Sequence, residues 1–399
     1  MAGQKTVQEL KVDNLSMRQL MELDACTRCG ECLKWCPVYE VKKDERINAR
    51  GKLLQTKKIL RNQYSPLAKI FGHKVDDETM KGITADINEC AGCAACHVSC
   101  PVRIDTERLW ISLKESLIKS GYGPLDSQLM MIKGVTDPEK VNPFGEPRAK
   151  RGAWLPKNYQ TLKKSKYLYF VGCAGSYSAN RIPRSVIRIL DTVKDFDYTL
   201  LGGEEVCCGD PIARIGLIKE ADELVAKNVE KFEELGVETI FAACSGCYKN
   251  LLHRFPKKYE ILHVTELFEK LIGDGGLRFT KDLNRKAIFF DGCDSARVSG
   301  LYEPPRNILK AIPGFEVIDF DRNRAYAMCC GGPMSGSHPD MGYGIAAKRI
   351  EEARGKGVDL IITSCPTCMV TLREGAKNAK IEMEVQDLPM LLPGLLEGK

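Results

Sequence analysis

The sequence predicts a multidomain protein of the α+β and α/β class, in which a helical N-terminal module precedes two duplicated α/β domains. Three observations support this prediction. One cysteine run occurs twice within the first hundred residues, two sets of five cysteines follow at an offset of 120 to 122 residues, and short apolar segments alternate with helical patterns in both repeats. A chain of 399 residues is long enough for two or three domains.

The composition excludes several classes of protein. Apolar residues make up 44% and charged residues 28% of the chain, which is typical of a globular protein. The net charge of +6 is a mild surplus, so we expect no nucleic-acid partner. No apolar run approaches the roughly 18 residues that a transmembrane helix needs, and the charged segment 1–25 is unlike a signal peptide. We therefore expect a cytoplasmic protein without a transmembrane segment of its own.

Cysteine is the unusual residue, with 18 copies. Disulfide-rich scaffolds are short and secreted, whereas this chain is long and has ordinary helix and strand patterns. In a reducing compartment, so many thiols indicate metal ligands.

Eight cysteines form two runs with the spacing Cys-x2-Cys-x2-Cys-x3-Cys-Pro, which is the spacing of bacterial ferredoxins. In this pattern three thiolates hold one cubane 4Fe–4S cluster and the fourth thiolate ligates the other cluster. The sequence therefore predicts two cubane clusters, one on Cys26, Cys29, Cys32 and Cys100 and the other on Cys90, Cys93, Cys96 and Cys36. Paired zinc knuckles are the weaker alternative, because zinc favours two separated Cys-x2-Cys pairs.

The remaining ten cysteines form the two repeated sets, and each set contains a Cys-Cys-Gly and a Cys-x2-Cys. The sets are Cys173, Cys207, Cys208, Cys244 and Cys247, and Cys293, Cys329, Cys330, Cys365 and Cys368. A tetrahedral zinc or a cubane cluster needs only four thiolates. The fifth thiolate therefore implies an unusual metal core or a redox pair.

Strands and helices alternate around these ten cysteines. Segments 167–173 and 287–293 predict buried strands that end at a cysteine, and segment 218–235 has the apolar spacing of a helix. Segments 237–247 and 358–368 predict strands that run into Cys-x2-Cys. This alternation favours a parallel sheet in each repeat, with the cysteines beyond the carboxyl ends of the strands, where such sheets bind ligands. A helix that begins at Cys-x2-Cys would direct its positive end towards the thiolates.

The Cys-Cys-Gly repeats resemble the CCG domains of heterodisulfide reductases, and LMELDACTRCGECLKWCP (20–37) resembles the ferredoxin part of their membrane-associated D-type subunit. The chain is similar also to the DsrK subunit of sulfate-reducer membrane complexes and to the C-type subunit of anaerobic glycerol-3-phosphate dehydrogenase. The resemblance extends from about residue 20 to residue 390.

The resemblance implies that each CCG domain holds a non-cubane 4Fe–4S cluster on its five thiolates, with the substrate disulfide between the two clusters. Both cysteine sets are complete, which favours catalysis over simple conduction. The segment 332–344 after the second Cys-Cys-Gly differs from segment 210–216 after the first. One of the two sites could therefore hold zinc instead.

The leading hypothesis is the catalytic iron–sulfur subunit of a heterodisulfide-reductase-type complex, which reduces an organic disulfide or oxidises the thiols. Its electrons would pass through the two cubanes to or from a membrane cytochrome b or quinone partner, and the chain would be peripheral on the inner face of the membrane. One rival is a non-catalytic relay that anchors a flavin dehydrogenase; its flavin would lie in a partner, since the chain has no Gly-x-Gly-x2-Gly. The other is a DsrK-like subunit that acts on a protein-borne disulfide or trisulfide.

We expect four segments: a helical ferredoxin-type domain at 1–120, a linker at 121–165, and CCG domains at 166–280 and 281–399. The insert between the two ferredoxin runs predicts helices. Segment 105–120 predicts a further helix, capped at its N-terminus by an aspartate.

The smaller signals are ambiguous. Basic residues gather at 46–61 and 148–166, and such runs are either solvated faces or docking faces for an acidic partner, a membrane surface or an anionic substrate. His338 is a surface histidine or a proton donor to a leaving thiolate, and His97 shields or tunes a cubane. His73, His253 and His263 have no supporting context.

Overall fold

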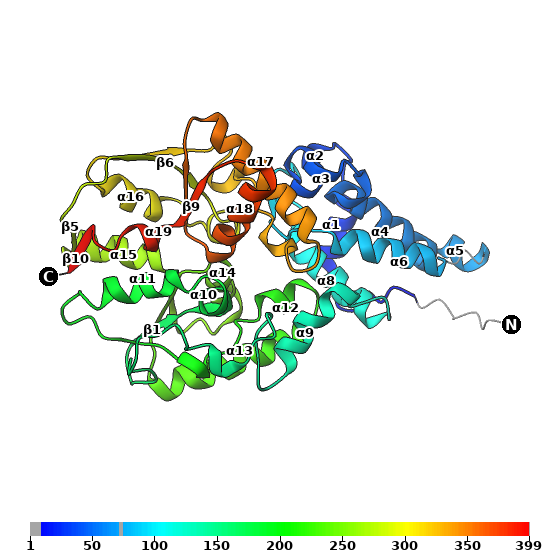
Figure 1. Cartoon of the computed structure of the whole chain (residues 1–399). Helices are drawn as coiled ribbons and strands as arrows, with labels where there is room; N and C mark the ends of the chain where they lie inside the picture. Colours follow the sequence, from blue (N-terminus) through cyan, green and yellow to red (C-terminus); the bar gives the residue numbers. More distant parts are fainter. Residues whose placement is uncertain (1–8, 72–74, 399) are drawn as a thin grey trace.

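The computed structural model of the chain describes residues 9–71 and 75–398, so His73 and part of the N-terminal segment lie outside the described residues. Figure 1 shows a helical N-terminal module at one end and two α/β domains stacked beside it. The predicted multidomain class is thus confirmed. No helix among residues 9–71 and 75–398 has the length and hydropathy that a bilayer crossing requires.

The N-terminal module is built from helices, as the sequence predicted, and these helices pack around an apolar core. Asp105 caps α8 by accepting a hydrogen bond from the backbone N–H of Arg108, which confirms the predicted start of that helix. Leu53, Ile83 and Leu109 are among its buried residues. The helices are α1 (Met17–Ala25), α2 (Glu31–Trp35), α3 (Pro37–Lys42), α4 (Ala49–Tyr64), α5 (Pro66–Phe71), α6 (Asp77–Asn88), α7 (Ala95–Val98) and α8 (Thr106–Lys119).

The segment 121–165 contains helix α9 (Leu129–Thr136) and otherwise follows an irregular path. Val135 and Val141 pack in one apolar cluster with cysteines of the first CCG domain, and Trp154 belongs to the large core of the α/β domains. This segment therefore contributes side chains to the core of the domain that follows it.

The first CCG domain contains a four-stranded parallel sheet in the order β2-β1-β3-β4. Its strands are β1 (Tyr167–Phe170), β2 (Tyr198–Thr199), β3 (Thr239–Ala242) and β4 (Glu260–His263). Every residue of β3 is buried, as expected for a central strand with helices on both faces. The helices are α10 (Gly172–Tyr177), α11 (Arg181–Leu190), α12 (Asp210–Arg214), α13 (Ile218–Leu235), α14 (Ser245–Arg254) and α15 (Val264–Gly273).

The second CCG domain repeats this topology. Its parallel sheet has the order β7-β6-β8-β9, which is the first order with each strand replaced by its counterpart. The strands are β6 (Arg285–Phe290), β7 (Phe315–Asp319), β8 (Leu360–Thr363) and β9 (Glu384–Asp387). The helices are α16 (Glu303–Ala311), α17 (Pro339–Gly355), α18 (Pro366–Ala379) and α19 (Leu388–Leu391).

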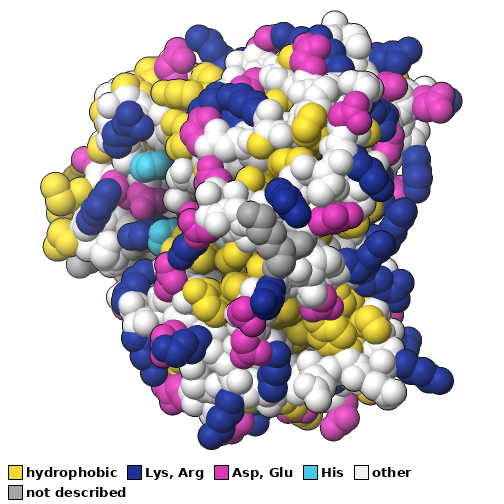
Figure 2. Space-filling view, turned by 90° about the vertical axis from the view of Figure 1, so that its left-hand side faces the viewer, with side chains coloured by type: hydrophobic (Ala, Val, Ile, Leu, Met, Phe, Trp, Pro, Cys, Tyr) yellow, Lys and Arg dark blue, Asp and Glu magenta, His cyan; other side chains and the backbone are white. Residues whose placement is uncertain are grey.

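The two CCG domains share one hydrophobic core and are related by a pseudo-twofold arrangement. Helix α15 of the first domain packs on α16 of the second, and the equivalent pair α11 and α19 packs in the same way. Strands β5 (Leu277–Phe279) and β10 (Leu396–Gly398) form an antiparallel pair that ties the C-terminus to the first domain. On the face drawn in Figure 2, basic side chains alternate with acidic ones and apolar patches lie between them.

Candidate functional site

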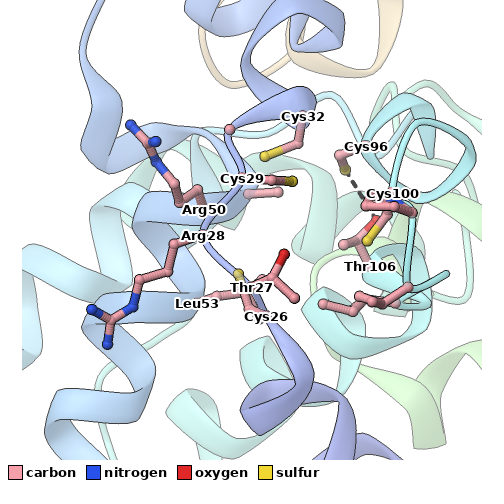
Figure 3. Close-up of a pocket in the computed structure, with 15 residues that line it drawn as sticks. Cys26, Thr27, Arg28, Cys29, Cys32, Arg50, Leu53, Cys96, Cys100 and Thr106 are labelled. Carbon is pink, nitrogen blue, oxygen red and sulfur yellow. Dashed lines mark hydrogen bonds between the residues drawn. The ribbon is translucent and has the colours of Figure 1, made fainter.

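The first group of thiols lines a cavity of about 30 Å³ in the N-terminal module. Cys26, Cys29, Cys32 and Cys100 surround this space in Figure 3, and the side chain of Cys96 lies at its edge, hydrogen-bonded to Thr106. These first four are the residues that the ferredoxin spacing predicts for one cluster. They come from two runs more than sixty residues apart in the chain.

The second group lies deeper, where the N-terminal module meets the second CCG domain. Cys36, Cys90, Cys93 and Cys96 are close enough to affect one another's ionisation. Burial raises the pKa of the Cys36 thiol to about 12. A bound iron would reverse this shift, since metal coordination deprotonates a thiol.

The five thiols of the first CCG set are all buried and form a connected group. The Cys207 thiol lies between those of Cys173 and Cys208. The Cys208 thiol also contacts Cys247, which in turn contacts Cys244. Cys173 follows β1, whereas Cys244 follows β3 and is the N-cap of α14. The carboxyl end of the sheet thus gathers the set, as the strand pattern predicted.

The second CCG set has the same arrangement. The Cys329 thiol lies between those of Cys293 and Cys330. The Cys330 thiol also contacts Cys368, which in turn contacts Cys365. Hydrogen bonds from Cys329 and Cys368 lower the pKa of the Cys330 thiol, just as Cys207 and Cys247 lower that of Cys208. The duplication therefore extends from the sequence to the contacts of the thiols.

Two further contacts join the cysteine groups to one another. Cys244 of the first set is adjacent to Cys365 of the second set, at the interface between the two domains. Cys93 of the N-terminal module is adjacent to Cys329 of the second set. The N-terminal module, the second CCG set and the first CCG set thus follow one another in space.

Backbone amides donate to several of the sulfur atoms, which is a feature of sites that hold anionic thiolates. Gly92 donates to Cys90 at 3.4 Å, Gly331 donates to Cys329 at 3.3 Å and Gly332 donates to Cys330 at 3.3 Å. The buried thiols fit the ligands of iron–sulfur clusters, and the amides fit the hydrogen-bond donors that stabilise such thiolates. Among the described residues, no three His, Cys, Asp or Glu side chains converge closely enough for a single metal ion.

Glycine is required at the position after each vicinal cysteine pair. Gly209 has φ +97° and Gly331 has φ +85°, which is backbone conformation that other residues rarely adopt. A Cβ atom on Gly331 would lie 2.2 Å from the carbonyl oxygen of Gly342 in α17. The glycine therefore lets α17 pack directly against the cysteine pair.

Arg151 and Glu205 are functional candidates that the sequence did not single out. The Arg151 guanidinium lies 3.6 Å from the Cys173 sulfur and 2.5 Å from a carboxylate oxygen of Glu205, and both side chains are almost fully buried. Glu205 also accepts hydrogen bonds from the backbone N–H groups of Val171 and Gly172. Arg151 belongs to the basic run 148–166, but nothing in that run distinguishes it from its exposed neighbours.

The two CCG sites differ because of these neighbours. A hydrogen bond from Cys207 and the charge of Arg151 lower the pKa of the Cys173 thiol despite its burial. At the equivalent Cys293, the hydrogen bond with Cys329 is outweighed by burial and by Asp294, and the pKa is raised.

A buried network of charges lies at the junction of the three domains. Arg214 donates to Asp210, to both oxygens of Asp294 and to the carbonyl of Gly92. Lys249 lies 2.8 Å from Asp210 and 3.0 Å from Glu107 of α8. Burial alone would raise the pKa of Asp210, but Arg214 and Lys249 lower it to about 2.

The histidines have different surroundings. His263 is fully buried at the end of β4, and its Nε2 bridges the carbonyls of Ala243 and Ser364 from the two CCG domains. His338 precedes α17, where its ring contacts Ser337, and His97 contacts the carbonyl of Ile104.

Comparisons with known proteins agree with this architecture. A family model described as a 4Fe-4S dicluster domain matches residues 22–104, and one described as a cysteine-rich domain matches residues 167–252 and 287–373. These matches define an iron–sulfur protein with a dicluster domain and a repeated cysteine-rich domain. The chain is 31% identical to the D-type subunit of the dihydromethanophenazine:CoB–CoM heterodisulfide reductase of Methanosarcina acetivorans, over 97% of both proteins. It belongs to the family of heterodisulfide reductase D-type subunits.

More distant relatives share the same modules. The chain is 29% identical to the EtfAB:quinone oxidoreductase of Syntrophomonas wolfei, over 93% of this chain and 57% of that protein. The crystal structure of a hypothetical protein from Helicobacter pylori is similar with a TM-score of 0.55 and 12% identity, covering 96% of this chain and 73% of that one. The latter similarity shows the fold alone.

Proposed function

We propose that this chain is the catalytic iron–sulfur subunit of a complex that reduces an organic disulfide to two thiols, or oxidises the thiols. The observation that carries the proposal is the pairing of two complete five-cysteine sets, which meet at Cys244 and Cys365 between the pseudo-symmetric domains. A disulfide has two sulfur atoms, and its reduction takes two electrons and two protons. A duplicated site suits a substrate with two sulfur atoms.

The ligand sets follow from the groups described above. Cys26, Cys29, Cys32 and Cys100 would hold one cubane, and Cys90, Cys93, Cys96 and Cys36 the other. The two five-cysteine sets would hold the non-cubane clusters, with zinc as the alternative in one of them. When bound, these groups supply single electrons and an iron with affinity for sulfur. The contact of Cys93 with Cys329 supports entry of electrons on the side of the second CCG domain.

The protein's own residues keep the site dry and fix the thiolates. All ten CCG cysteines are buried, and amides of Gly209, Gly331 and Gly332 donate to sulfur atoms. Arg151 places a positive charge beside Cys173, which stabilises the thiolate form there.

The partner would be a redox subunit, and a membrane cytochrome b is the partner that the hypothesis expects. Attachment to such a subunit would make the chain peripheral on the inner face of the membrane. The names of the Methanosarcina and Syntrophomonas relatives, a dihydromethanophenazine-linked reductase and a quinone oxidoreductase, support an electron carrier of the membrane as the other substrate of the complex.

The deciding experiment is anaerobic iron and sulfide analysis of the purified complex, with EPR spectra recorded after addition of an oxidant and a thiol. Four clusters predict roughly 16 irons in this chain, at four irons for each site, and a paramagnetic signal that needs the thiol. Cys293→Ser should remove that thiol-dependent signal. Cys29→Ser should disturb one cubane cluster but leave the thiol-dependent signal unchanged. About 8 irons, bound zinc and no thiol-dependent signal would contradict catalysis.

A non-catalytic relay for a flavin dehydrogenase is the second candidate, and the similarity to an EtfAB:quinone oxidoreductase favours it. A stable complex with a flavoprotein, together with the absence of the thiol-dependent signal, would identify this role. A protein-borne disulfide or trisulfide is the third candidate. Turnover of that protein and not of small disulfides would identify it.

A further inference from the structure

Different parts of the chain cover the two CCG sites. Cys173 of the first set shares an apolar cluster with Val141 of the segment 121–165, and Figure 1 shows α9 of that segment beside α12. Cys293 of the second set instead shares an apolar cluster with Cys93 of the N-terminal module. The two sites are therefore equivalent in fold but not in their surroundings.

The backbone donors of the two sites are alike. In each site, the amides of the two residues that follow the vicinal cysteine pair donate to the sulfur atoms of that pair. These residues are Gly209 and Asp210 in the first site, and Gly331 and Gly332 in the second. The backbone hydrogen bonds thus do not distinguish one site from the other.

Arg151 adds a side-chain donor to the first site. Its Nη1 and Nη2 atoms each lie 3.6 Å from the Cys173 sulfur and donate to it. Nη2 also donates to Glu205 at 2.5 Å, and the guanidinium lies 5.7 Å from the ring centre of Tyr177, so the group is held in place. Because the side chain is only 1% exposed, water screens its charge little.

The second site uses its buried arginine differently. Ala327 stands two residues before the vicinal cysteines, at the position of Glu205 in the first site. Arg297 donates through its three side-chain nitrogens to backbone carbonyls, those of Ala325, Cys93 and Ala327. Within residues 9–71 and 75–398, no cationic side chain donates to a thiol of the second set.

A cation beside a ligand sulfur affects the reduction potential of the cluster. Reduction adds a negative charge, so a positive charge and N–H donors at the sulfur stabilise the reduced form and raise the potential. A hydrogen bond from Cys207 and the charge of Arg151 lower the pKa of the Cys173 thiol, and the opposing charge of Glu205 has a smaller effect than that of Arg151. The net influence of the buried ion pair on the first site is therefore that of a cation.

We propose that Arg151 is a positioning residue that gives the first CCG site a higher reduction potential than the second, so that electrons collect at the first site. The contacts between thiols follow the same direction, from Cys93 to Cys329 and from Cys365 to Cys244. Electrons that enter from the N-terminal module would thus pass the second site before they reach the first. This inference rests on the clusters proposed above and adds the order in which the two sites are reduced.

The test is an anaerobic redox titration of the complete, cluster-loaded chain, followed by EPR. Cys173→Ser and Cys329→Ser each remove one transition, which assigns the transitions of the first and second sites. We expect the first-site transition at the higher potential in the parent chain. In the double variant Arg151→Met, Glu205→Gln it should fall by about 59 mV or more, a tenfold change in a one-electron equilibrium. The transitions of the second site and of both cubanes should not move.

The double variant removes both charges, so no buried carboxylate is left without its cation. Its matched control is the neighbouring pair, Arg148→Met with Glu204→Gln, whose side chains are 31% and 45% exposed, and this control should leave every transition unchanged. Arg151→Lys keeps a cation beside Glu205 but lacks the planar fork of donors. It guards against a loss of folding, and its first-site potential should fall by less than that of the double variant.

Iron analysis distinguishes the failure of this inference from the failure of the proposed function. About 16 irons with the first-site potential unchanged in the double variant and in Arg151→Lys, or with the second site at the higher potential in the parent chain, would overturn the inference alone. Zinc in the first site would also overturn it. The thiol-dependent EPR signal would then decide the proposed function separately.

Discussion

Two neighbouring arginines of the basic run 148–166 show how much burial changes the role of one residue type. Arg148 pairs with Glu204 at 2.8 Å, and its side chain is 31% exposed. Arg151 pairs with Glu205, and its side chain is 1% exposed. The first pair contributes little, because water screens it, whereas the second is part of the surroundings of Cys173.

Arg151→Met should therefore be much more damaging than Arg148→Met. The change leaves Glu205 buried without its cation, and breaking such a pair costs about 3–5 kcal/mol. The exposed control should cost less than about 1 kcal/mol. Hydrogen exchange of the β1 amides measures the difference as a local loss of protection. Equal protection in the two variants would show that Arg151 is not needed to compensate Glu205.

His263 predicts a pH dependence of stability. Burial lowers its pKa from 6.5 to about 4, so the folded chain keeps it neutral where the unfolded chain already binds a proton. The folded chain with a neutral His263 is fully stable above pH 6.5, and it loses free energy of unfolding as the pH falls towards 4, because only the unfolded chain then binds the proton. Between pH 7.5 and pH 5.5 the loss amounts to about 1.4 kcal/mol.

His263→Gln isolates this effect, because the glutamine amide can still donate to the carbonyl of Ser364 but does not titrate in this range. Urea denaturation at the two pH values should show the parent chain losing about 1.4 kcal/mol more than the variant. A parallel pH dependence in both chains would mean that His263 is not the group responsible.

At the scale of elements, the position of α17 depends on one glycine. A Cβ on Gly331 would lie 2.2 Å from the carbonyl oxygen of Gly342, and no side-chain movement relieves a contact with backbone. Gly331→Ala should displace α17 or the vicinal cysteines and lower the iron content by about the four irons of one cluster. The EPR signals of the cubanes should remain.

Gly355→Ala, at the last residue of α17, is the control. Nothing lies within 4 Å of the Cβ it would add, and replacing a helical glycine by alanine is favourable by up to about 1 kcal/mol. We expect full iron content and unchanged or slightly higher stability. Full iron content in Gly331→Ala as well would show that the close approach of α17 is dispensable.

The sequence predicted those elements whose conformation is determined by residues close together in the chain. The alternation of apolar strands and amphipathic helices predicted both parallel sheets, and Asp105 predicted the start of α8. Because the carboxyl ends of parallel strands meet at one edge, the grouping of the CCG cysteines also followed from the pattern.

The contacts between domains had no such signal. Arg297 donates to the carbonyl of Cys93 across 204 residues of sequence, and Lys249 reaches Glu107 across 142 residues. Neither residue has a neighbour that marks it, and a single sequence does not indicate which distant segments pack together. The sequence did not distinguish Arg151 from the other residues of the basic run 148–166 for the same reason, since basic residues are usually exposed.

For the whole molecule, the buried charges at the junction of the three domains bring together side chains from all three parts of the chain. Lys249 of the first CCG domain lies between Glu107 of the N-terminal module and Asp294 of the second CCG domain, at 3.0 Å and 3.6 Å. Its side chain is 7% exposed. One cation thus offsets carboxylates from all three parts of the chain.

Lys249→Met should therefore weaken the coupling of the domains more than the fold of any one of them. It leaves Glu107, Asp210 and Asp294 with Arg214 as the remaining cation, and an uncompensated buried charge costs about 3–5 kcal/mol. Calorimetry of the cluster-loaded chain should show a separate, earlier transition for the N-terminal module, and amides of α8 should exchange faster. Lys219→Met is the control, because Lys219 is 85% exposed and 4.0 Å from Glu223, and it should change neither observation. A single transition at the parent temperature in the Lys249 variant would mean that the apolar contacts alone hold the three domains together.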